Sequence, residues 1–182
     1  MKFITSIKSL VVVTSLAVGI SGVSHAAESP ADLNDLQIAH VAYTADNIDI
    51  RYAHLALALT QDPNIRSFAQ TMIRDHSAVN KQALALLKKL QAQPQDNFLS
   101  QHLTVNSEKL INQMSQLRGA AFDKFYANNE LAYHKAVNKL VEFSFIPNIE
   151  NGEVKALFGA GLEIFKAHQQ HAQVMVDKLN AN

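Results

Sequence analysis

Residues 68–82 read FAQTMIRDHSAVNKQ, and they align without a gap on residues 126–140, YANNELAYHKAVNKL. Six of the 15 positions are identical, and both stretches contain the pattern H-x-A-V-N-K, which starts at His76 and at His134. Apolar residues in the first stretch recur at a spacing of three and four, as on one face of an α-helix, and His76 falls on that face. The repeat therefore predicts two related helices, each with one inward-facing histidine.

Start signals on both sides of this repeat predict four long helices. Ser29-Pro30 and Asp62-Pro63 each place a proline directly after an N-cap residue. Gly119 and the turn Asn151-Gly152 mark the other two starts. The predicted helices cover residues 31–59, 63–90, 120–145 and 153–179.

The connection between the second and third predicted helices is long. Pro94, Asp96, Asn97 and Ser100 interrupt the helical pattern of residues 91–118, and only residues 107–117 are expected to form a shorter helix. A long crossover at this place is typical of ferritin-like bundles. The predicted fold class is therefore all-α: a ferritin-like four-helix bundle with a long crossover between the second and third helices.

The first 26 residues have the features of a signal peptide. Lys2 and Lys8 precede or flank the start of a short apolar run, residues 10–20, and Ser24-His25-Ala26 fits a cleavage signal. The apolar run is too short to span a bilayer as a stable anchor. We expect cleavage near Ala26, a periplasmic location without an integral membrane anchor, and one helical domain over residues 27–182.

Charge and composition exclude several partners and chemistries. Without Lys2 and Lys8 the chain carries 14 basic and 16 acidic residues, so a nucleic-acid partner is not expected. The chain has no cysteine, so it forms no disulfides. It also lacks a G-x-S-x-G motif, a glycine-rich phosphate loop and a Cys-His pair, which excludes the usual hydrolase and nucleotide-binding sites. The sequence indicates neither a protein partner nor an oligomeric state.

Every predicted helix has at least one ionisable residue on its buried face, and the principal candidates are, in chain order, Asp49, His76, His134 and His168. When residues are counted from the turns between helices, the four positions lie at similar heights along the bundle axis. The exception is His168, which is offset from His134 by about 6 Å at about 1.5 Å per residue. We expect the four side chains to converge. A buried carboxylate beside several imidazoles is costly unless it is paired, and a divalent metal satisfies all of them together.

Several other residues are secondary candidates for this site. Glu130 lies one turn before His134, and its depth is closer to that of His168. His171 forms an H-x-x-H pair with His168, and Asp75 could orient an imidazole on a neighbouring helix. Two asparagines follow the repeat histidines by four residues and are candidates to orient the rings: Asn80 and Asn138.

The nitrogen-rich set suits zinc, copper or nickel, and it is also compatible with iron. A ferritin-type di-iron site is not expected, because no E-x-x-H motif occurs in the sequence. With a metal, the function would be sequestration or redox and stress protection in the cell envelope. Two other interpretations remain open. The histidines could fix helix register in a non-catalytic structural or partner-binding module, or two of them could clamp a haem. Whether the protein is an enzyme stays open.

The chain resembles a bacterial family called domain of unknown function 4142, exported proteins with a ferritin-like fold. The matching stretches are NIDIRYAHLAL (47–57), FAQTMIRDHSAVN (68–80), GAAFDKFYANNELAYH (119–134) and His168. The resemblance implies an acidic residue at the position of Asp49. It also implies a second Asp-His pair, where this chain has Tyr133-His134 instead, which argues against a symmetric two-site mechanism. The family implies a fold but no activity.

Overall fold

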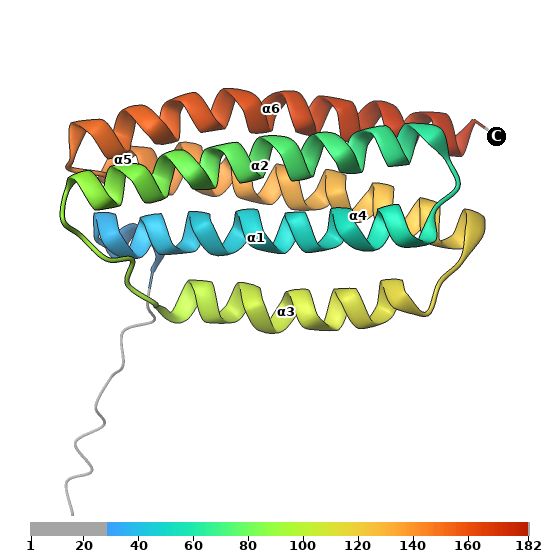
Figure 1. Cartoon of the computed structure of the whole chain (residues 1–182), viewed down its shortest axis with the longest axis horizontal. Coiled ribbons are helices and arrows are strands. Elements are labelled where there is room, and N and C mark those ends of the chain that lie inside the picture. The colour runs from blue at the N-terminus through green and yellow to red at the C-terminus, as the bar shows by residue number, and fades with distance from the viewer. Residues whose placement is uncertain (1–28, 182) are drawn as a thin grey trace, which may run out of the picture.

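The computed structural model describes residues 29–181, and every regular element in this range is helical. Four long helices run side by side (Figure 1): α1 (Asp35–Leu59), α2 (Pro63–Lys89), α4 (Gly119–Leu140) and α6 (Gly152–Asn180). A fifth, α3 (Phe98–Ser115), lies along the outside of α1. The short elements are η1 (Pro30–Asp32), η2 (Val141–Phe145) and α5 (Ile146–Asn148). The all-α prediction is confirmed for the described residues.

Side-chain caps fix where the helices begin. Asp62 accepts hydrogen bonds from two backbone N–H groups in the first turn of α2, and Asn151 does the same for α6. Ser29 caps only the 3₁₀ turn η1. Asn34 and Gln37 then form a capping box that starts α1. The prediction of a first helix from residue 31 was therefore wrong by four residues.

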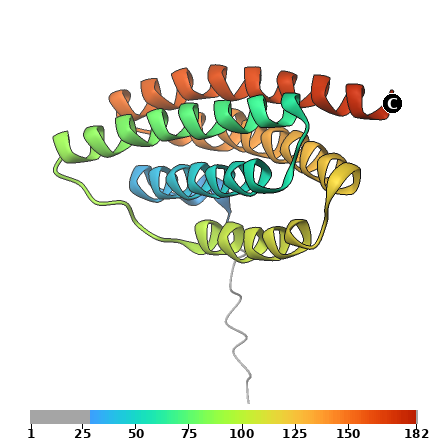
Figure 2. The same ribbon diagram turned by 45° about the vertical axis from the view of Figure 1, so that its right-hand side comes forward.

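The long helices form two antiparallel pairs, α1 with α2 and α4 with α6, and α2 packs on α6 to join the pairs (Figure 2). Aromatic residues, including Tyr52, Phe68 and Tyr126, fill one end of the core. Ile38, Phe145 and their neighbours fill the other end. On α2 and α6 the candidate residues His76 and His168 lie between these two apolar clusters, whereas Asp49 on α1 lies inside the first cluster, between Ile48 and Tyr52.

The connection between α2 and α4 contains a longer helix than the sequence predicted. We expected a helix over residues 107–117, but α3 begins at Phe98. The side chain of Asn97 accepts hydrogen bonds from two backbone N–H groups, and Ser100 Oγ accepts one from the N–H of Asn97. These two residues were interpreted as helix breaks, whereas they form a capping box that starts α3.

The chain stays helical beyond α4, through a single π-helical turn (η2) and then α5, to Asn148. The third helix was predicted to end three residues earlier, because Pro147 was interpreted as a break; proline is tolerated in the first turn of a helix. Measured from these ends, His134 lies 14 residues before Asn148 and His168 lies 16 after Gly152. The depth offset between the two histidines is therefore about 3 Å at about 1.5 Å per residue.

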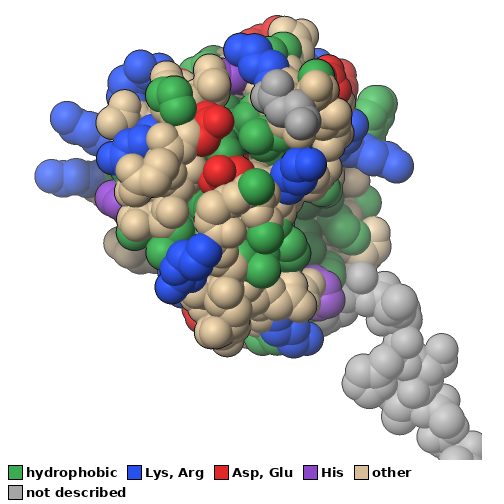
Figure 3. Space-filling model, turned by 90° about the vertical axis from the view of Figure 1, so that its right-hand side faces the viewer, with side chains coloured by type: hydrophobic (Ala, Val, Ile, Leu, Met, Phe, Trp, Pro, Cys, Tyr) green, Lys and Arg blue, Asp and Glu red, His purple; other side chains and the backbone are tan. Residues whose placement is uncertain are grey.

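The predicted signal peptide, residues 1–26, lies outside the described residues, and the domain boundaries stay a prediction. Among residues 29–181, no helix is both long enough and apolar enough to cross a membrane. Figure 3 shows the end of the molecule that is on the right in Figure 1. On this face the Lys and Arg side chains are spread around Asp, Glu and hydrophobic side chains and do not gather in one patch.

Candidate metal centre

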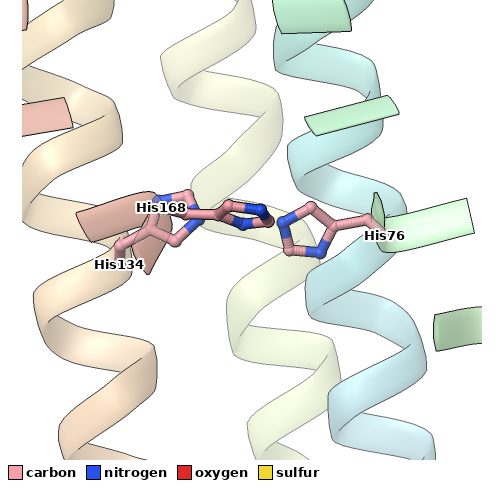
Figure 4. A group of neighbouring side chains, drawn as sticks. All are labelled: His76, His134 and His168. Carbon is pink, nitrogen blue, oxygen red and sulfur yellow. The ribbon is translucent and has the colours of Figure 1, made fainter. Parts of the chain in front are cut away.

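Three histidines from three helices meet in the core. His76 comes from α2, His134 from α4 and His168 from α6, and their rings face a common centre (Figure 4). The ring centroids are 5.8 Å apart for His76 and His134, 5.4 Å for His76 and His168, and 5.5 Å for His134 and His168. One nitrogen of each ring lies within 4.8 Å of the others. Each of these side chains is at most 5% exposed.

Two fully buried carboxylates lie beside these rings, Asp49 from α1 and Glu130 from α4. Asp49 Oδ2 lies 2.6 Å from His76 Nε2 and 3.5 Å from His134 Nε2. Glu130 Oε2 lies 3.8 Å from His134 Nδ1. Asp49, Glu130 and His134 make a second group whose ligand atoms all lie within 4.8 Å of one another. The structure thus brings the four principal candidates together, with Glu130 beside them.

One of the two nitrogens of each imidazole donates a hydrogen bond to an oxygen atom outside the cluster. His76 Nδ1 donates to Asp46 Oδ1 at 2.7 Å, and His134 Nδ1 donates to the backbone carbonyl of Glu130 at 2.9 Å. His168 Nε2 donates to Asp75 Oδ2 at 3.0 Å. A nitrogen that donates carries the proton of a neutral ring, so the other nitrogen keeps its lone pair. In metalloproteins, such an outer acceptor fixes the tautomer and orientation of a metal-bound histidine.

The inner atoms of the cluster have no hydrogen-bond partner among the described residues. These atoms are His76 Nε2, His134 Nε2, His168 Nδ1, and both carboxylate oxygens of Asp49 and of Glu130. His76 Nε2 and Asp49 Oδ2 lie in close ionic contact at 2.6 Å. Buried polar atoms without partners are costly, and the ion pair of His76 with Asp49 still leaves the inner nitrogens of His134 and His168 without one. Their arrangement fits a bound cation.

Charges inside the cluster set its protonation. Burial alone would lower the pKa of His76, but the carboxylates of Asp49 and Asp46 outweigh burial and raise that pKa to about 10. Burial would raise the pKa of Asp49, but the charge of His76 outweighs it and lowers the pKa to about 2. Without a metal, His76 and Asp49 therefore form a buried ion pair at neutral pH.

The other members of the cluster are neutral in the absence of a metal. Burial lowers the pKa of His134 below its ordinary value and that of His168 to about 4. Burial and the charge of Asp49 raise the pKa of Glu130 well above its ordinary value. At pH 7 two imidazoles are therefore ready to bind a metal, and His76 must first release its proton.

Replacing His168 by glutamine should reduce the acid sensitivity of the metal-free protein. The pKa of His168 is about 4 in the folded chain and 6.5 in the unfolded chain, so between these values only the unfolded chain takes up the proton. Stability contributed by neutral His168 is thus present above pH 6.5 and is lost as the pH falls to 4. With chelator, urea titrations at pH 7 and pH 4 should show a loss about 3 kcal/mol larger in wild type than in His168→Gln.

The matched control for this measurement is His102→Gln, because His102 is exposed on α3 and contacts only Asn106 among the described hydrogen bonds. This variant should keep the pH dependence of the wild-type protein. Equal losses of stability in wild type and in His168→Gln would show that His168 is not held neutral in the folded chain.

Two of the secondary candidates, His171 and Asp75, contribute no atom to the centre of the cluster. His171 is exposed, and its ring packs edge-on against Phe68 at 5.1 Å, so it does not join the cluster. Asp75 reaches His168 from outside and also accepts two hydrogen bonds from Arg74, so it orients an imidazole. The expectation that Asn138 orients a ring was wrong, because its side chain donates to the α6 backbone carbonyl of Phe165 and to Gln169.

Sequence reasoning missed Asp46. Its carboxyl group is 6% exposed, and burial raises its pKa, although the hydrogen bond from His76 opposes that effect. Asp46 precedes Asp49 by three residues, so both lie on one face of α1. That i, i+3 spacing was the signal available in the sequence, but the partner of Asp46 is on another helix and depends on how α1 is rotated.

The fold and the site define an all-helical protein with a buried cluster of histidines and carboxylates. The chain matches the family described as "Domain of unknown function (DUF4142)" over residues 21–175, and it belongs to this family. Comparisons with curated proteins and with solved structures gave no match. The resemblance stated from the sequence is therefore confirmed at the level of the family, whose description assigns no activity.

Proposed function

We propose that this protein binds one transition-metal ion through Asp49, His76, His134 and His168. The observation that carries the proposal is that the two nitrogens of each imidazole have different surroundings. One nitrogen of each ring donates to an acceptor outside the cluster, and the other nitrogen points to the centre, where His76 meets the carboxylate of Asp49 and the nitrogens of His134 and His168 have no hydrogen-bond partner. A histidine that only fixes helix register needs no inward-facing nitrogen, whereas a metal ligand needs one nitrogen facing the metal and the other fixed by an acceptor.

Three nitrogens and one carboxylate oxygen suit zinc or copper better than a harder cation. In a tetrahedral zinc site the ligand atoms lie about 2.0–2.1 Å from the metal and therefore about 3.3 Å from one another. In each of the two groups one ligand atom per residue lies within 4.8 Å of the others, and Asp49 and the three histidines would reach the tetrahedral spacing by rotation of their side chains. Four protein ligands are typical of sites that hold an ion, so sequestration or redox and stress protection is favoured over catalysis.

A single ion per chain is expected. The two possible ligand groups share His134, and only Nε2 of that ring is available, because Nδ1 donates to a backbone carbonyl. One lone pair binds one metal ion. The carboxyl group of Glu130, neutral in the metal-free protein, then acts as a hydrogen-bonding neighbour of Asp49.

The architecture and the N-terminal sequence support a ferritin-like bundle that acts in the periplasm. The long helices α1, α2, α4 and α6 surround the site, and the connection from α2 to α4 is the long one, as in ferritin-like bundles. Residues 1–26 have the charge and length pattern of a signal peptide. An exported site of this composition would meet environmental zinc and copper directly.

A zinc titration against a competing chromophoric chelator tests this function. We expect one zinc ion per chain. Asp75→Ala should weaken zinc binding by about 10–100-fold, because His168 loses the acceptor that orients it. Asp75→Asn should recover part of this loss, since an amide oxygen still accepts from His168 Nε2. Asp32→Ala, an exposed substitution in η1, should leave the affinity unchanged. Zinc that binds equally well to Asp75→Ala, or with no defined stoichiometry, would contradict the proposal.

A second function is supported by one contact in the cluster. His76 is ion-paired with both Asp46 and Asp49, so this part of the cluster is satisfied without a metal. Under this alternative the cluster fixes the register of a non-catalytic, partner-binding bundle. It leaves the inner nitrogens of His134 and His168 unexplained, and it predicts no saturable zinc binding.

A further inference from the structure

A cavity of about 150 Å³, partly open to the surface, lies next to the histidine cluster. It extends from the level of Asp46 and Phe165 toward the end of the bundle that contains Phe145. Phe165 separates the two sites, because one of its ring faces stacks on His76 with centroids 4.7 Å apart and the residue also lines the cavity. The cavity is therefore distinct from the proposed metal ligands.

Small residues on facing helices make this space. Ala42 of α1, Ala83 of α2 and Gly161 of α6 line the cavity. A Cβ atom added at Gly161 would meet only Phe165 Cε2, at 3.8 Å, which is an ordinary contact. A larger side chain at any of these positions would have filled the space.

The walls of the cavity are almost entirely apolar. Asp46 is the only charged residue among them, and its carboxylate is engaged by His76. The hydroxyl group of Tyr133 donates to the backbone carbonyl of Ala45. Asn80 differs, because it is 7% exposed and its Oδ1 is buried without a hydrogen-bond partner. The lining thus offers a buried, unused hydrogen-bond acceptor, Asn80 Oδ1, in a largely apolar space.

We propose that this cavity binds a small apolar molecule of about the size of a benzene ring that carries one hydroxyl or N–H group. An apolar cavity of about 150 Å³ is large enough to hold benzene. Asn80 Oδ1 would accept the single hydrogen bond from the ligand. A charged ligand does not fit, because no counter-charge in the lining is free to compensate for its desolvation.

Phenol and benzene are the probes that test this proposal, with binding measured by calorimetry on the purified protein in the presence of chelator. Binding does not require the metal, so failure of the metal proposal would not affect the result. We expect one phenol per chain, displaced by benzene. Asn80→Leu should weaken phenol binding about tenfold, the effect of one lost hydrogen bond, and leave benzene binding unchanged.

The cavity itself is tested by Gly161→Leu, which should abolish phenol binding. Its matched control is Gly159→Leu, two residues away on the same helix, where an added Cβ meets no atom within 4 Å and the position does not line the cavity. Gly159→Leu should bind phenol like wild type. Should Gly161→Leu fail to fold, Ala83→Leu fills the cavity from α2 and takes its place. Absence of phenol binding to wild type, or unchanged binding in the filled variant, would overturn the proposal.

Discussion

Replacing His76 by leucine lowers the free energy of unfolding of the metal-free protein by about 3–5 kcal/mol, the usual cost of removing one partner from a buried ion pair. The substitution leaves the fully buried carboxylate of Asp49 without its cation, and Asp46 without its hydrogen-bond donor. Urea titration at pH 6 with chelator measures the loss. The exposed substitution His102→Leu provides the control and should cost less than about 1 kcal/mol.

The loss of stability in His76→Leu should depend on pH. The pKa of His76 is about 10 in the folded chain and 6.5 in the unfolded chain, so the folded chain keeps the proton longer. The stability that His76 contributes is thus fully present below pH 6.5 and decreases as the pH rises to 10. We expect the difference between wild type and His76→Leu to shrink over that interval. A difference that is small at pH 6, or that grows with pH, would contradict the ion pair.

Zinc raises the melting temperature at pH 7 and has little effect at pH 5. At a hundredfold excess over the dissociation constant, a metal that binds only the folded chain stabilises it by about 2.7 kcal/mol. That stabilisation corresponds to roughly 5–10 °C for a domain of this size. His76 must release one proton to bind, because its pKa lies above both pH values, so affinity falls about tenfold per pH unit. At pH 5 the same zinc concentration stabilises by only about 0.4 kcal/mol.

Thermal melts of single-histidine variants complete this test. His134→Ala and His168→Ala should each lose most of the zinc-induced shift, whereas His102→Ala should keep it. Wild-type melting curves that coincide with chelator and with excess zinc at pH 7 would favour the register function over the metal site.

The sequence predicted the parts of this site that depend on helix periodicity. Asp49, His76, His134 and His168 were found because each falls on the apolar face of its own helix, and the structure brings them together. The depth of His168 was less accurate, because it depends on a π-helical turn and on α5, which periodicity does not indicate. The capping box that starts α3 was missed because Asn97 and Ser100 favour turns as well as helix starts.

The contacts that give the site its chemistry could not be predicted from one sequence. Asp46 and Asp75 act on histidines of other helices, so their roles depend on how neighbouring helices are rotated and aligned. The cavity beside Phe165 depends on which small residues face one another across the bundle. Such relations between distant segments arise only in the packed molecule.

X-ray absorption at the zinc edge, on protein loaded with one equivalent of zinc at pH 7, tests the central claim most directly. The metal site described above predicts four nitrogen and oxygen ligands at about 2.0–2.1 Å, with the scattering pattern of three imidazole rings. The variant His76→Ala/His134→Ala/His168→Ala should lose this pattern. A shell of oxygen ligands without imidazole, or the same spectrum from the wild-type protein and the triple variant, would contradict a metal centre built on His76, His134 and His168.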